Sequence, residues 1–150
     1  MGLEIERKFL VRSEDWRPSA GYGQLIRQGY LSSGGKATVR VRSFDDEHAV
    51  ITLKGKLSGI TRPEFEYPIP IEDARELLAL AQPQVLEKRR YDVPYGGLTW
   101  EVDVFEGRHL GLIIAEIELA SADQEIDLPS WLGEEVTHDD RYYNASLARS

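Results

Sequence analysis

Residues 3–11 read Leu-Glu-Ile-Glu-Arg-Lys-Phe-Leu-Val, and charged and apolar side chains alternate along this stretch. Successive side chains of a β-strand point to opposite faces of the sheet, so the alternation predicts a strand with one charged face and one apolar face. The charged face carries Glu4, Glu6 and Lys8, and the apolar face carries Ile5, Phe9 and Val11, with Arg7 as the exception. The stretch therefore predicts a strand whose apolar side alone faces a core.

The same alternation recurs along the rest of the chain, and the charged positions are sorted by sign. Some segments carry basic pairs, some carry acidic pairs, and one is mixed: Arg40 and Arg42, Lys54 and Lys56, Lys88 and Arg90; Glu101 and Asp103, Glu116 and Glu118; and Arg62, Glu64 and Glu66. One interpretation is an open sheet whose charged face is solvated. The other is a closed barrel whose charged face lines a lumen. Sorting by sign favours the barrel, in which Lys and Arg would bind a polyanion and carboxylates a hard divalent cation.

Turn residues divide the chain into strands that fit antiparallel hairpins. We predict eight strands, at residues 3–11, 24–31, 37–43, 48–56, 61–68, 85–92, 98–105 and 112–120. Apolar residues at helical spacing predict a helix over residues 72–81, and a second helix is expected to start near Asp139 or Asp140. Short helical turns are expected at residues 13–20 and 121–125. The predicted fold class is α+β and mainly β, a closed eight-stranded antiparallel barrel with helices packed outside.

Length and composition restrict the class of protein. The chain has 150 residues, which suits one domain over residues 1–150, and its 18 Lys and Arg against 26 Asp and Glu give a net charge of -8 at pH 7. This acidic balance argues against broad nucleic-acid binding, which needs many phosphate contacts. No apolar run approaches the roughly 18 residues of a membrane helix, so we expect no membrane partner and a cytoplasmic protein. The absence of cysteine excludes disulfides, thiolate metal sites and a cysteine nucleophile.

The stretch Glu4-Ile5-Glu6-Arg7-Lys8 resembles the E-x-E-x-K signature of the CYTH domain family, also called the triphosphate tunnel metalloenzymes. Later stretches resemble successive strand motifs of the family in the same order: Arg40-Val41-Arg42, Thr52-Leu53-Lys54, Arg62-Pro63-Glu64-Phe65-Glu66, Lys88-Arg89-Arg90, Glu101-Val102-Asp103-Val104-Phe105 and Ala115-Glu116-Ile117-Glu118. The C-terminal residues 135–137 and 141–144 are also similar to those of small bacterial members. The resemblance covers essentially the whole chain. It implies an eight-stranded barrel around a triphosphate-binding tunnel, with dependence on Mg²⁺ or Mn²⁺.

The resemblance also implies a division of roles among the charged residues. The phosphate chain would be bound by Lys8, Arg40, Arg42, Lys54, Arg62, Lys88 and Arg90. The metal would be bound by Glu4, Glu6, Asp103, Glu116 and Glu118, whereas Glu64, Glu66 and Glu101 would pair with the basic side chains. Glu4, Glu6 and Lys8 are the expected catalytic residues, with Glu4 or Glu6 as the proton acceptor beside the attacking water. Phosphoryl transfer depends mainly on positioning and charge neutralisation, so no covalent nucleophile is required.

The leading functional hypothesis is a metal-dependent hydrolase that cleaves inorganic triphosphate to pyrophosphate and phosphate, working as a monomer or homodimer. The alternatives within the family are a class IV adenylate cyclase and a hydrolase of nucleoside or thiamine triphosphates, and the compact chain favours the inorganic substrate. A polyphosphate-binding module without catalysis is disfavoured, because a pure anion binder gains nothing from carboxylates in its site unless a cation also binds. A lipocalin-like barrel for apolar ligands is disfavoured by the charged inner face.

The remaining notable residues are expected to be structural. His48, His109 and His138 are isolated and lack the paired spacing of metal ligands. Trp16, Trp100 and Trp131 are expected in the core or against helices, and Tyr30 in the core or at the rim of the lumen.

Overall fold

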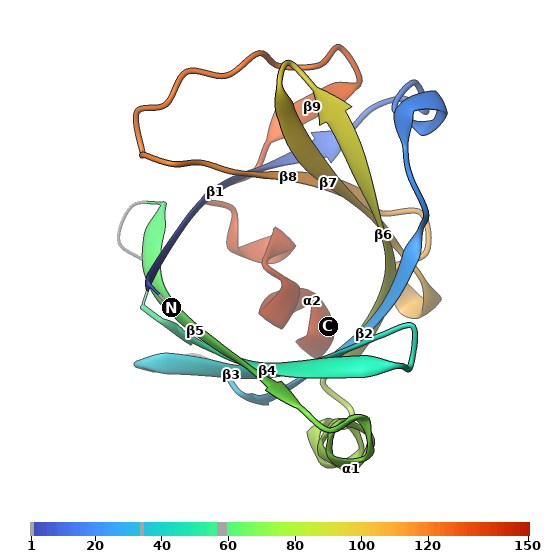
Figure 1. Ribbon diagram of the computed structural model, residues 1–150, viewed down its shortest axis with the longest axis vertical. Helices are drawn as coiled ribbons and strands as arrows, with labels where there is room; N and C mark the ends of the chain where they lie inside the picture. The colour runs from blue at the N-terminus through green and yellow to red at the C-terminus, as the bar shows by residue number, and fades with distance from the viewer. Residues whose placement is uncertain (1, 34, 57–59) are drawn as a thin grey trace.

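Eight antiparallel strands close into a barrel in the computed structural model, which describes residues 2–33, 35–56 and 60–150 (Figure 1). They are β1 (Gly2–Val11), β2 (Gln24–Ser32), β3 (Ala37–Phe44), β4 (His48–Gly55), β5 (Thr61–Ile69), β6 (Val85–Tyr95), β7 (Leu98–Phe105) and β8 (Ile113–Glu118). They pair in the order β5-β4-β3-β2-β6-β7-β8-β1, and β1 returns to β5. The predicted closed barrel and its strands are confirmed, although β6 runs beyond residue 92 and β8 stops before residue 120.

Strand β1 closes the barrel by pairing with a different neighbour along each half. Glu4 lies opposite Arg62 of β5, and Glu6 lies opposite Glu118 of β8. The end of β1 also pairs with a short additional strand, β9 (Leu132–Glu135), which Figure 1 shows beside the barrel wall. The sequence does not predict β9, because the four residues Leu-Gly-Glu-Glu contain no alternation.

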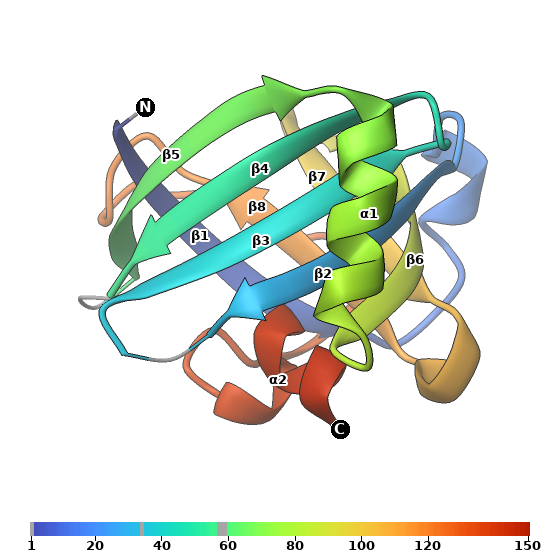
Figure 2. The ribbon, with the colours of Figure 1, turned by 90° about the horizontal axis from the view of Figure 1, so that it is seen from below.

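Helix α1 (Ile71–Ala81) lies across the outside of the barrel over β2 to β4 (Figure 2). Its Ala74 and Leu78 are buried in one cluster with Val41 of β3. Gly29 of β2 lies close beneath the helix, since a Cβ there would stand 2.8 Å from the Cβ of Ala81. The helix predicted over residues 72–81 is confirmed.

The C-terminal segment crosses one end of the barrel as a 3₁₀ turn, η3 (Asp140–Tyr142), followed by α2 (Asn144–Arg149) (Figures 1 and 2). The expectation that a helix starts near Asp139 or Asp140 is wrong for α2, because Tyr143 is extended, with φ -71° and ψ 137°. A 3₁₀ turn, η1 (Arg17–Ser19), lies within the expected residues 13–20, whereas residues 121–125 form only bends and a turn. An unpredicted 3₁₀ turn, η2, spans Gly107–His109. Among the placed residues, no helix has the length and apolar character needed to cross a membrane.

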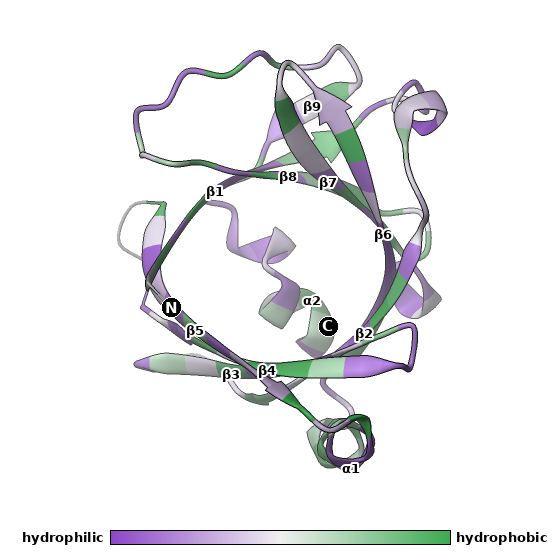
Figure 3. Ribbon diagram, viewed as in Figure 1, coloured by the Kyte–Doolittle hydropathy of each residue, from purple (hydrophilic) through white to green (hydrophobic). Residues whose placement is uncertain are grey.

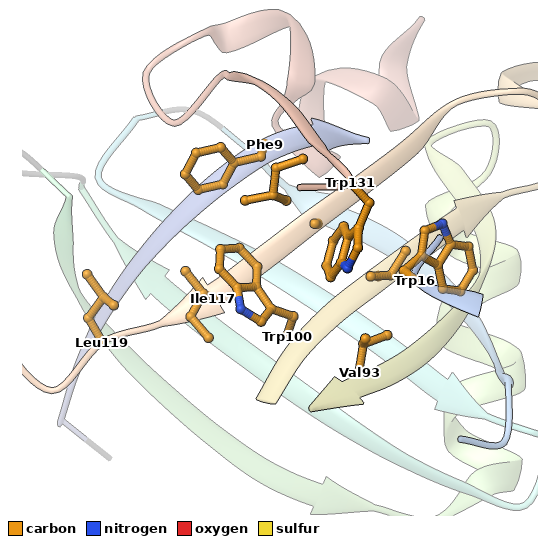
Figure 4. Packing of buried hydrophobic residues seen from close by; sticks show 10 residues of the cluster. Phe9, Trp16, Val93, Trp100, Ile117, Leu119 and Trp131 are labelled. Carbon is orange, nitrogen blue, oxygen red and sulfur yellow. The ribbon is translucent and has the colours of Figure 1, made fainter. Parts of the chain in front are cut away.

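Hydrophilic and hydrophobic residues alternate along the strands of the barrel wall, as Figure 3 shows. The largest apolar cluster packs on the outer faces of β1, β7 and β8 and includes Trp16, Trp100 and Trp131 (Figure 4). The rings of Trp100 and Trp131 meet edge to face with centroids 5.9 Å apart. The core positions predicted for the three tryptophans are confirmed.

A second apolar cluster lies on the lumen side, at the end of the barrel that α2 crosses. Its buried members are Tyr30, Leu86, Phe105, Ile114, Leu147 and Ala148. Strand alternation places Leu86 and Phe105 on the same strand faces as Lys88 and Asp103, so the inner face changes from charged to apolar where α2 packs. We call this end the α2 mouth, and the end at the β3–β4 hairpin the opposite mouth.

Candidate active site

A cavity of about 530 Å³ occupies the lumen, and charged side chains line it. The structure brings together there all but one of the residues predicted for the site: Glu4, Glu6, Lys8, Arg40, Arg42, Lys54, Arg62, Lys88, Arg90, Glu116 and Glu118. The predicted inward direction of these side chains is confirmed. Their individual roles stay predictions.

The wall formed by β3 presents cations that have few partners. Arg40 is only 9% exposed, and the Nε atoms of Arg40 and Arg42 have no hydrogen-bond partner among the residues placed by the structure. Burial lowers the pKa of Arg42 to about 10, and the nearby Arg40 and Arg90 add to the effect. Buried donors without partners cost free energy, and guanidinium groups match phosphate oxygens in geometry. This wall is therefore suited to receive an anion.

The wall formed by β6 to β8 presents cations that are already paired. Arg90 donates from Nε and Nη2 to the two carboxylate oxygens of Asp103, at 2.7 and 2.8 Å, and Lys88 Nζ lies 2.7 Å from Asp103 Oδ2. Asp103 is 0% exposed. Burial raises the pKa of Asp103, but Arg90 and Lys88 outweigh it and hold the pKa below its ordinary value.

Asp103 is the one predicted metal ligand that is absent from the cavity lining. Its side chain does not line the cavity, and both of its oxygens accept hydrogen bonds or ion pairs from buried cations. The alternating pattern of β7 identifies its face correctly, but the side chains of Arg90 and Lys88 cover it. Its contacts are with these two cations, and its role as a metal ligand stays a prediction.

The carboxylates of β1 and β8 are crowded on the same side of the cavity. Burial raises the pKa of Glu6 to about 7, and the negative charges of Glu116 and Glu4 contribute. Burial also raises the pKa of Glu4, but Lys54, whose Nζ lies 2.7 Å from Glu4 Oε1, outweighs it together with Arg62, so the net shift is downward. Burial and the charges of Glu4 and Glu64 raise the pKa of Glu118.

Glu116 contacts two cations of the cavity lining. Its two oxygens lie 3.3 Å from Lys8 Nζ and 3.1 Å from Arg90 Nη2. Burial raises the pKa of Glu116, but these cations outweigh it and hold the pKa well below its ordinary value. Glu116 is therefore a charged and occupied acceptor, whereas Glu6 forms no ion pair with any other placed residue.

Glu4, Glu6 and Glu118 are the candidates for holding a metal ion. As their side chains stand, no three acidic or histidine residues in the described part of the chain are arranged to hold one. Carboxylate oxygens are nevertheless the ligands that Mg²⁺ and Mn²⁺ prefer, and a cation would relieve the like-charge crowding around Glu6. The donor set fits a hard divalent cation in its chemistry.

A polar network at the α2 mouth includes residues that the sequence does not single out as functional. Asn144 Oδ1 accepts hydrogen bonds from Lys88 Nζ at 2.7 Å and Gln28 Nε2 at 3.2 Å. Gln28, which is 0% exposed, also donates to Tyr30 Oη at 2.9 Å. Tyr30 is both a buried core residue and part of the cavity lining, as its two predicted positions allowed. The polar residue Gln28, two positions before Tyr30 on the same face of β2, is the signal that points to this network.

The acids expected to orient basic side chains do so. Glu66 lies 2.9 Å from Arg42, Glu101 lies 3.1 Å from Arg90, and Glu64 lies 3.7 Å from Lys54. All three also line the cavity.

Comparison with known proteins supports the same conclusion as the fold and the cavity. The CYTH domain family model matches residues 2–148 of the chain. The chain belongs to the CYTH domain family. It is 45% identical to an inorganic triphosphatase of Acetivibrio thermocellus, over 100% of this chain and 96% of that protein, and 38% identical to an inorganic triphosphatase of Nitrosomonas europaea, over 98% and 97%. A crystal structure of an inorganic triphosphatase superposes with a TM-score of 0.71 at 35% identity, covering 97% of both chains.

The histidines of this CYTH barrel are absent from the lining of the cavity. His109 Nε2 lies 2.7 Å from the carbonyl oxygen of Leu147, and the His48 ring stacks on Phe44 with centroids 4.9 Å apart. These contacts support the structural roles predicted for His48 and His109.

Proposed function

We infer that this CYTH domain hydrolyses inorganic triphosphate to pyrophosphate and phosphate inside its barrel. The observation that carries the inference is a single cavity with incompletely paired guanidinium groups on the β3 wall and crowded carboxylates on the β1 and β8 wall. A phosphate chain and a divalent cation together satisfy both walls. The relatives described as inorganic triphosphatases, which align with nearly the whole chain, support it.

The lining favours an inorganic substrate over a nucleotide or thiamine triphosphate. Among the residues that line the cavity, the aromatic side chains are Tyr30 and Tyr143. Lys8 Nζ lies 5.5 Å from the Tyr143 ring centroid, so this ring already packs against a catalytic cation. A nucleobase or thiazolium ring needs an apolar slot, and the charged walls contain few apolar side chains that could form one.

We propose that Mg²⁺ or Mn²⁺ is held by Glu4, Glu6 and Glu118. When bound, such an ion supplies charge neutralisation at phosphate oxygens and lowers the pKa of coordinated water. Glu116 is a further predicted ligand, and it would have to exchange its contacts with Lys8 and Arg90 for the ion, as Glu4 would exchange its contacts with Lys54.

In this proposal, the protein's own side chains bind the phosphate groups, stabilise charge and accept a proton. Arg40, Arg42 and Arg62, with Lys54, bind and align the phosphate groups. Lys8 and Arg90 lie around Glu116 and stabilise negative charge that develops during phosphoryl transfer, a process that depends mainly on positioning and electrostatics. Glu6 lines the cavity beside Glu4 and forms no ion pair with any other placed residue, so it is our choice for accepting a proton from water.

A phosphate-release assay of purified protein tests the proposal. The substrates are triphosphate, pyrophosphate, ATP and thiamine triphosphate, each with Mg²⁺, with Mn²⁺ and with chelator. We expect the highest kcat/KM for triphosphate, poor use of pyrophosphate because it is too short to reach both walls, and no activity with chelator. Faster turnover of ATP with release of cyclic AMP would establish the cyclase instead, and tight binding of triphosphate without hydrolysis would establish a binding module. The predicted monomer or homodimer is checked by size-exclusion chromatography on the same preparation.

A further inference from the structure

The α2 mouth carries basic residues beyond those assigned to the site. Lys36 precedes β3, Lys56 follows β4, and Ala37 lies opposite Gly55, so the two lysines leave the sheet at the same end. Both are exposed, and both line the same cavity as the inner arginines. Arg149 of α2 also lines it and donates from Nη1 to Ser33 Oγ at 3.2 Å, across this mouth. Asp140 and Glu64, which lies opposite Lys54, are acidic residues of the same lining.

These lysines are not neutralised by ion pairs. Neither forms one with an acidic residue in the described part of the chain, and the five remaining residues, at 1, 34 and 57–59, include no acid. The extra positive charge of this mouth is therefore available to a solute.

The opposite mouth differs in sign. Its rim carries Glu66 near the end of β5 and Glu101 near the start of β7, with side chains 41% and 44% exposed. They pair with Arg42 and Arg90 of the cavity lining. An approaching anion meets carboxylates there before it meets the guanidinium groups behind them.

The shape of the α2 mouth directs a solute toward the lysines. Leu147 and Ala148 pack on Leu86, Phe105 and Ile114, so the apolar cluster closes the part of the mouth next to β6, β7 and β8. The cavity lining instead continues past Ser146 of α2 to Lys36 and Lys56. The part of this mouth that stays open is the part that carries the lysines.

The net charge of the protein makes the sign of the local charge at each mouth important for an anionic substrate. The chain has a net charge of -8 at pH 7, and triphosphate is itself a polyanion, so the protein as a whole repels it. We propose that the α2 mouth is the entrance for triphosphate, and that Lys36 and Lys56 capture and steer the anion toward Arg40 and Arg42. This rests on the proposed function, and it assigns to the two exposed lysines a role in association with the substrate.

The salt dependence of kcat/KM tests the role of the lysines. The variant Lys36→Gln/Lys56→Gln is compared with wild type and with Arg75→Gln, whose guanidinium pairs with Asp46 outside the barrel. From about 20 mM to about 500 mM salt, we expect the lysine variant to begin roughly fivefold below wild type in kcat/KM and to converge with it, because steering is screened. The loss falls on kcat/KM rather than on kcat, and Arg75→Gln follows wild type. An unchanged salt slope in the lysine variant would overturn the proposal, as would a deficit that persists in high salt.

Blocking each mouth in turn tests the direction of entrance. The natural chain has no cysteine, so Lys36→Cys and Thr99→Cys each provide a unique site for a bulky maleimide. Thr99 is exposed near the start of β7, on the strand face of Glu101, and thus marks the opposite mouth. Labelling at position 36 should lower kcat/KM severalfold more than labelling at position 99. Equal or reversed effects contradict the assignment, whereas a wild-type protein that does not hydrolyse triphosphate would defeat the proposed function itself.

Discussion

The two walls of the cavity use the same kinds of cation in opposite ways. On the β6 to β8 wall, Lys88 and Arg90 are buried against Asp103, with contacts of 2.7 to 2.8 Å. On the β3 wall, Arg40 is buried and Arg42 is partly buried, yet their Nε atoms have no partner in the described structure. On the β6 to β8 wall the cations have acidic partners, whereas on the β3 wall Arg42 pairs with Glu66 but Arg40 forms no ion pair among the described residues.

This difference separates stability from binding. Removing one member of a buried ion pair leaves an uncompensated charge, whereas removing an unpaired buried cation relieves a cost that the folded state already carries. Variants on the paired wall should therefore lose stability first, and variants on the β3 wall should lose affinity first.

The largest effect is expected from Asp103→Ala. The change leaves the buried Lys88 without its paired carboxylate and removes one of three carboxylate partners from Arg90, so we expect the free energy of unfolding to fall by about 3 to 5 kcal/mol in urea titrations. Asp103→Asn, which keeps the shape, serves as a milder variant if the first does not fold. Asp46→Ala, which breaks the exposed pair with Arg75, should change stability little. Comparable losses in the Asp103 and Asp46 variants would show that the paired wall does not depend on its buried acid.

Arg40→Gln should produce the converse result. We expect triphosphate affinity to weaken by about 2 to 4 kcal/mol, because a desolvated charge contact to phosphate is lost. Calorimetric titration with triphosphate measures the affinity, and a thermal melt of the free protein measures stability. The melting temperature should stay level or rise. A marked fall in melting temperature with unchanged affinity would reverse the roles of the two walls.

A pH titration tests Glu6, one of the crowded carboxylates of β1 and β8. Burial and neighbouring carboxylates raise the pKa of Glu6 from 4.5 to about 7, so the folded protein holds this proton more tightly than the unfolded chain does. In chelator, the stability that this proton contributes is therefore complete below pH 4.5 and is lost as the pH rises toward 7. Glu6→Gln lacks this loss, so its advantage in melting temperature over wild type should grow across that range. A constant difference would show that the pKa of Glu6 is ordinary. With metal present, the same variant should lower kcat strongly.

A smaller effect is expected from Asn144→Ala, which removes the acceptor shared by Lys88 and Gln28. Because this residue positions a cation rather than contacting the acidic side, we expect kcat to fall by roughly tenfold or less while KM changes little. Asn144→Asp keeps the acceptor and should recover part of the activity. The exposed His138→Ala should leave kcat unchanged. If the Asn144 and His138 variants behaved alike, the network at the α2 mouth would have no role in turnover.

The barrel and most of its lining were predictable, because alternation in residues such as Glu4, Glu6 and Lys8 is a local property of the chain. The pairing of Asp103 was not, since it depends on the β6–β7 register that sets Arg90 opposite it. Asn144 could not be found from spacing, because it meets Gln28 only after the C-terminal segment folds back over a separation of 116 residues. Strand β9 is formed by the partner strand β1, not by its own sequence pattern.

The divided pairing of β1 has a consequence for folding. Glu4 stands in the half of β1 that pairs with β5, and Glu6 stands in the half that pairs with β8. The two acids are therefore positioned by the two different pairings of β1 that close the barrel. Of the barrel strands, β1 is synthesised first, and the second half of β1 has no partner in β8 until residues 113–118 have also been synthesised. Such distant contacts form slowly because the intervening chain must lose its freedom first. Pairing of β1 with β8 thus closes the barrel and brings the carboxylates of β1 and β8 together in a single folding event. A chain that stops short of β8 has strands but no complete site.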